Sequence, residues 1–70
     1  MAGQMEEGVS ELEAVLTEQP GHAGAYVQLA SVYYRTGQFA RAWRYVRQAE
    51  ALGAPVAELI AALRRVSVEP

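Results

Sequence analysis

Apolar residues recur along the chain at the three- and four-residue spacing of amphipathic helices. One stripe comprises Tyr26, Leu29, Ala30 and Tyr33, and a second comprises Phe39, Ala42, Trp43, Val46 and Ala49. Each stripe predicts a helix with one apolar face. Gly37 and Gly53 suit the left-handed conformation that ends a helix, and Pro20-Gly21 marks an earlier break. The pattern therefore predicts an all-α fold with helices at about residues 4–18, 23–35, 39–52 and 55–66.

The chain also repeats itself with a period of 34 residues. Small, bulky, and small or branched residues follow one another at the same spacing in both copies: Gly8, Leu12 and Val15 recur as Ala42, Val46 and Ala49. This is the period of helix-turn-helix repeats that stack side by side, and such arrays bind other proteins.

The residues between the two copies resemble a tetratricopeptide repeat. In that family an aromatic, a Leu, a small residue and a Tyr on a first helix precede an Ala and a bulky residue on a second, with Pro near the end. The matching residues here are Tyr26, Leu29, Ala30, Tyr33, Ala42 and Val46, with Pro20 at the Pro position of the preceding unit. Tyr26 replaces the usual Trp, and Pro55 falls one place late. The resemblance implies an antiparallel helix-turn-helix stack in one domain over residues 1–70, with a half repeat at 6–22 and a full repeat at 23–56.

The last predicted helix is interpreted as a cap over residues 55–68. Ile60 and Leu63 lie 34 residues after Tyr26 and Leu29 and are also apolar. Arg64 instead follows Ala30 by 34 residues, and a long charged side chain there obstructs a second packed helix. An array end with one apolar and one solvated face is typical of a capping helix.

The first predicted helix has no such cover, because the other half of its repeat is absent from the sequence. Its apolar residues are Val9, Leu12, Val15 and Leu16. A single core below roughly 70 to 80 residues seldom supplies more than about 3 to 5 kcal/mol. Two explanations stay open: the chain is a fragment of a longer array, or it self-associates as a homodimer or larger oligomer. In the second case the last helix of one copy, through Ile60 and Leu63, covers the first helix of another.

The resemblance also implies a binding groove lined by the first helix of each repeat. The groove positions of the complete repeat are Val27, Ser31, Tyr34 and Arg35, with Gly24 and Gln28 at the rim. Family members that hold a terminal carboxylate carry Lys, Asn and Arg at the places of Gly24, Val27, Gln28 and Ser31, so that clamp is missing. Such a surface suits an apolar or amphipathic segment with an acidic flank. The alternative is that Val27 and Tyr34 only pack on a neighbouring helix.

These features predict a protein–protein interaction module, a scaffold or adaptor for a protein or peptide partner that also self-associates. The alternative is a purely structural element whose apolar surface is consumed by its own copies.

The charged residues are unevenly distributed along the chain. Residues 1–20 carry five Glu and no basic residue, whereas residues 21–49 carry Arg35, Arg41, Arg44 and Arg47 without an acid. The Arg row is interpreted as a solvated face or as a surface for an acidic partner.

Other classes of function find little support in the sequence. A net charge of −2 and the lack of Lys argue against a nucleic-acid partner. The single histidine, His22, follows Pro20-Gly21 in a turn, and cysteine is absent, so we expect no metal site, no cofactor and no catalysis. Glu7 with Glu11, and Ser10 and Ser31, have no partner residues that would make them catalytic. We expect no membrane insertion and a cytoplasmic location.

Overall fold

The computed structural model describes the backbone of residues 2–69 and the side chains of residues 6–69. This part of the chain forms four helices: α1 (Ala2–Glu18), α2 (Ala23–Arg35), α3 (Phe39–Ala51) and α4 (Ala57–Val66). The predicted all-α fold is confirmed, and the predicted range of α2 agrees with the structure. The fourth helix begins later than expected because the Val56 carbonyl is the first acceptor, receiving the Ile60 N–H at 2.9 Å.

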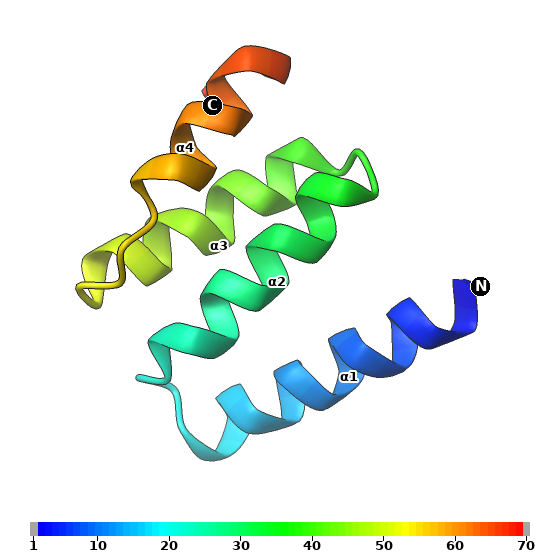
Figure 1. The fold of residues 1–70 in the computed structure, drawn as a ribbon. Coiled ribbons are helices and arrows are strands. Elements are labelled where there is room, and N and C mark those ends of the chain that lie inside the picture. The colour runs from blue at the N-terminus through cyan, green and yellow to red at the C-terminus, as the bar shows by residue number, and fades with distance from the viewer. Residues whose placement is uncertain (1, 70) are drawn as a thin grey trace.

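The helices follow one another as an antiparallel stack (Figure 1). The most extensive packing joins α2 to α3, while α1 packs on α2 and α4 packs on α3. In Figure 1, α1 lies beside α2 at one end of the stack, and α4 crosses α3 at the other. Within residues 2–69, no helix combines the length and the apolarity that a membrane crossing requires.

The core lies between α2, α3 and α4 and contains the two predicted stripes except Tyr26 and Phe39, which are half-buried and pack against it. Its members are Leu29, Ala30, Tyr33, Ala42, Trp43, Val46, Ala49, Val56, Ile60 and Leu63. Ala30, Ala42 and Ala49 are fully buried. Because these side chains are small, the helices can approach one another closely. The large side chains of Trp43 and Leu29 fill the remaining space.

Two glycines end the central helices in the same way. Gly37 and Gly53 have φ of 79° and 88°, a left-handed conformation that other residues rarely adopt. After α2, the Gln38 N–H donates to the Tyr33 carbonyl at 2.8 Å and the Gly37 N–H to the Tyr34 carbonyl at 3.2 Å. The turn after α3 repeats this pair of bonds at Gly53 and Ala54. Both pairs are the helix-ending arrangement in which glycine allows the chain to reverse.

Candidate protein-binding surfaces

The predicted groove residues lie on one face of α2. Val27, Ser31 and Tyr34 are half-buried, and Arg35 is exposed at the end of the helix. Val27 and Tyr34 also pack against the edge of the core, as in the alternative interpretation that these side chains pack on a neighbouring helix. The Tyr34 ring lies 6.2 Å from the ring of Phe39 at the start of α3, measured between centroids. This contact restrains Tyr34 while part of its surface remains accessible.

The residues predicted for self-association divide into two groups. On α1, Val9, Leu12, Val15 and Leu16 are half-buried, and all but Val15 pack against the core of the same chain. On α4, Ile60 is 8% exposed and Leu63 is fully buried. The α4 residues therefore cover α3 of their own chain, as expected for a cap, and are not available at the surface of this arrangement.

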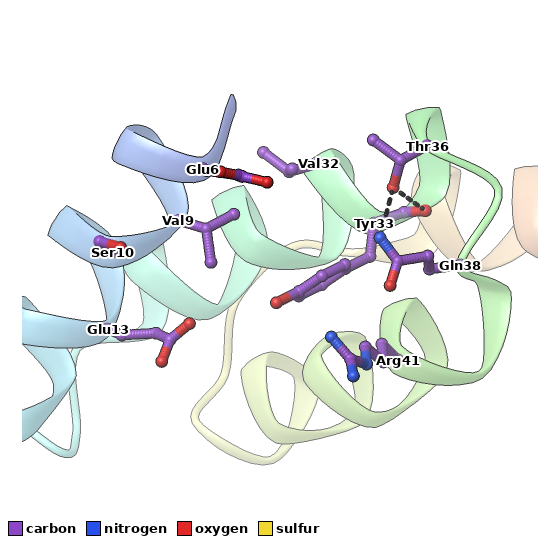
Figure 2. Close-up of a pocket in the computed structure, with 9 residues that line it drawn as sticks. All are labelled: Glu6, Val9, Ser10, Glu13, Val32, Tyr33, Thr36, Gln38 and Arg41. Carbon is purple, nitrogen blue, oxygen red and sulfur yellow. Dashed lines mark hydrogen bonds between the residues drawn. The ribbon is translucent and has the colours of Figure 1, made fainter. Parts of the chain in front are cut away.

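A hollow of about 580 Å³ lies where α1, α2 and the start of α3 meet, and Figure 2 shows it. Its lining comprises Glu6, Val9, Ser10 and Glu13 from α1, Val32, Tyr33 and Thr36 from the end of α2, and Gln38 and Arg41 from the following segment. Hydrogen bonds hold the side chains of Thr36 and Gln38 in place at one end of the hollow. The Thr36 hydroxyl donates to the Tyr33 carbonyl at 3.2 Å, and the Gln38 amide donates to the Thr36 hydroxyl at the same distance.

Opposite charges face this hollow from two sides. Glu6 and Glu13 come from α1, Arg41 comes from α3, and the Tyr33 ring lies between them (Figure 2). The Arg41 guanidinium lies 5.6 Å from the centre of the Tyr33 ring, within the range of a cation–π contact. Behind Tyr33, the ring of Tyr45 stacks on it at 5.6 Å. Burial raises the pKa of Tyr45, and the nearby Tyr33 and Glu13 raise it further.

Nothing in the sequence pattern predicts this hollow. Of its lining residues, Val9 is predicted to take part in self-association and Arg41 belongs to the Arg row, and none of the four predicted groove residues contributes. The lining comes from three helices, and no short motif connects Glu13 with Arg41. The pattern identified the helices but carried no signal for which polar side chains meet between them.

His22 has a structural role at the start of α2. It is exposed, as expected for a turn residue, and its Nδ1 accepts the Ala25 N–H at 3.0 Å. This bond satisfies one of the free N–H groups of the first helical turn. Among the described side chains, no three residues of the His, Cys, Asp or Glu types gather closely enough to hold a metal ion.

The Arg row of α3 is solvated only in part. Arg41 and Arg44 are exposed, whereas Arg47 is half-buried and pairs with Glu50 at 2.9 Å. Arg47 also pairs with Glu69, which follows α4, and Glu69 lies 3.6 Å from Arg64. No pattern in the sequence predicts that the segment after α4 returns to α3.

The stack can be compared with known protein families. The sequence profile of the tetratricopeptide repeat family matches residues 1–65. Comparison with curated proteins and with solved structures gives no match. The profile covers nearly the whole chain, from α1 to the last turn of α4, and repeats of this type are typically non-catalytic protein-interaction modules. The profile match, the 34-residue period, the buried small residues and the helix order agree, and the chain belongs to the tetratricopeptide repeat family.

Proposed function

We propose that this chain is an adaptor that holds a short segment of a partner protein against the face of α2. The observation that carries this proposal is the arrangement of Val27, Tyr34 and Arg35, two partly accessible apolar side chains beside an exposed cation. Aromatic and Arg side chains supply much of the binding energy at protein interfaces. Tyr34 is also restrained by Phe39, so less conformational freedom is lost on binding.

The chemistry of this face specifies the bound segment. Val27 and Tyr34 suit an apolar side chain of the partner, and Arg35, which directly follows Tyr34, suits a carboxylate. An apolar residue followed by Asp or Glu is therefore the expected core of the partner segment.

A double variant tests this face. Tyr34→Ala with Arg35→Ala should weaken binding of the partner segment by at least about tenfold, as expected for loss of an anchor and its neighbouring charge. Partners captured by the wild-type chain would be identified by mass spectrometry, and the segment would be titrated as a synthetic peptide by calorimetry. A matched control is Leu52→Ala with Arg65→Ala, since both residues are exposed on other parts of the chain. Equal peptide affinity of the wild type and the folded Tyr34/Arg35 variant would remove the α2 face from consideration.

Self-association is a second candidate function, supported by the position of α1. This helix packs on α2 at one end of the stack, and Val15 is half-buried there without belonging to the core cluster. A second copy that covers this side would make stability rise with protein concentration.

Val15→Asp is the appropriate test of self-association, because substitutions at Ile60 would disrupt the chain's own core. Sedimentation equilibrium should show a concentration-dependent oligomer for the wild type and a monomer for the variant. A wild-type mass of 7.6 kDa at every concentration would contradict self-association.

A further inference from the structure

A second hollow lies along α3, and none of the predicted groove residues of α2 lines it. It has a volume of about 320 Å³ and is lined by Ala40, Trp43, Arg44, Arg47 and Glu69. Arg44 and Arg47 are three residues apart and therefore neighbours on the same helix face. The Arg47 guanidinium lies over the Trp43 ring at 5.3 Å from its centre. This hollow thus combines two arginines with a buried aromatic wall.

One of the five lining residues reaches the hollow from beyond α4. Ser67 ends that helix in an extended conformation, with φ −152° and ψ 151°, and its N–H donates to the Leu63 carbonyl at 2.8 Å. The extended backbone carries Glu69 back to α3, where its carboxylate pairs with Arg47 and approaches Arg64. The hollow therefore already accommodates a carboxylate from the same chain.

The returning segment is weakly held. Val68 is 89% exposed, so its side chain does not anchor the segment next to Glu69. The ion pairs of Glu69 join partly exposed side chains. Such ion pairs are weak in water and are screened by salt. A second carboxylate from another molecule can therefore displace Glu69 at little cost.

The hollow also has unused capacity for hydrogen-bond acceptors. Arg44 lines it and forms no ion pair with any residue that the structure describes. Arginine favours carboxylates because its planar group donates two parallel hydrogen bonds.

We propose that this hollow binds a carboxylate side chain from an acidic segment of a partner protein, and that Glu69 competes for the same place within the chain. The site is independent of the proposed α2 face, since Tyr34 and Arg35 do not line it. Deleting the Glu69 carboxylate then increases affinity for an acidic segment, and removing the arginines weakens it.

The test uses a hexaglutamate peptide blocked at both ends, with hexaglutamine as its uncharged counterpart. Trp43 is the single tryptophan of the chain and lines the hollow, so its emission reports binding directly. Hexaglutamate should change this emission in a saturable way at low salt, whereas hexaglutamine should not. Glu69→Gln should tighten binding about two- to fivefold, the range that corresponds to loss of a competing exposed ion pair. Arg44→Gln with Arg47→Gln should weaken it at least about tenfold.

Two matched controls separate the site from general charge effects. Glu58→Gln removes one exposed negative charge from α4, and Arg41→Gln with Arg65→Gln removes two exposed positive charges that lie outside the hollow and outside the proposed α2 face. Each should change peptide affinity less than about twofold, and circular dichroism should show unchanged helicity for every variant. The proposal is overturned if these controls match the hollow variants, or if Glu69→Gln leaves the affinity unchanged.

Two further outcomes would identify a different occupant. Displacement of hexaglutamate by inorganic phosphate at matched ionic strength and similar concentration would show a general anion site and contradict the carboxylate assignment. Sedimentation that shows association of the wild type, lost with Arg44→Gln and Arg47→Gln, would assign the hollow to a second copy of this chain instead of a partner protein. A failure of either kind leaves the α2 face testable, because its variants and its peptide are different.

Discussion

Replacing Leu29 by alanine tests the packing at the centre of the α2–α3 pair. Leu29 is fully buried, so the substitution removes three carbons that gain the whole benefit of burial. At about 0.8 kcal/mol for each buried group, the lost transfer free energy is about 2.4 kcal/mol. The cavity that remains adds to this, and buried Leu→Ala changes cost about 2 to 5 kcal/mol in total. We expect a loss of about 3 kcal/mol in the free energy of unfolding.

Leu52→Ala is the matched control, because it makes the same chemical change at a side chain that is 45% exposed. We expect it to cost about 1 kcal/mol or less. Both variants would be unfolded with urea and followed by far-UV circular dichroism and by Trp43 fluorescence. A domain of this size has only about 3 to 5 kcal/mol from a single core, so Val46→Ala, which removes two buried carbons, supplies a milder second variant. Equal losses at Leu29 and Leu52 would refute the assignment of α2 and α3 to the core.

Three further predictions concern two glycines, the start of α2 and pH. Gly8→Ala should stabilise the chain by up to about 1 kcal/mol, because Gly8 lies inside α1 and an added Cβ meets nothing within 4 Å. Gly37→Ala should destabilise the chain by roughly 1 to 2 kcal/mol, because the φ of 79° is strained for alanine. Thermal unfolding measures both effects. His22→Ala should cost about 1 kcal/mol and His22→Asn much less, since Asn restores a capping acceptor. Burial raises the pKa of Tyr45 above 10.0. The contribution of the neutral Tyr45 side chain to stability is therefore complete below about pH 10 and is lost as the pH rises through the folded-state pKa. Tyr45→Phe should reduce this alkaline loss of stability in urea titrations.

Most of the fold was predictable because local signals and the repeat period agree. Pro20-Gly21 and Gly37 bracket α2, and both limits of this helix were predicted. At the fourth helix the sequence suggested a start at Pro55, but the first carbonyl to accept a helical hydrogen bond is that of Val56. Periodicity identifies which residues share an apolar face, whereas the first hydrogen bond of a helix depends on how the preceding turn is placed.

The candidate sites were less predictable because they depend on contacts between helices. The α2 face follows from register alone, so Val27 and Tyr34 could be assigned to one surface, and their role in binding stays a prediction. The contact of Glu69 with Arg47 joins residues 22 positions apart and depends on the path of the chain after α4. The approach of Arg64 to Glu69, at 3.6 Å, depends on the same path of the chain.

The order of packing in the stack has a consequence for how the molecule opens. Extensive contacts join each helix to the next one along the described chain, and the α2–α3 contact is the largest. A terminal helix can therefore detach while the central pair remains folded, as in other repeat arrays with nearest-neighbour energetics. The backbone amides of α1, whose apolar side chains are only half-buried, should exchange hydrogen with solvent earlier than those of α2 and α3. Transient detachment of α1 exposes the neighbouring side of α2, so access to the stack is set by a local equilibrium at its end and does not require global unfolding.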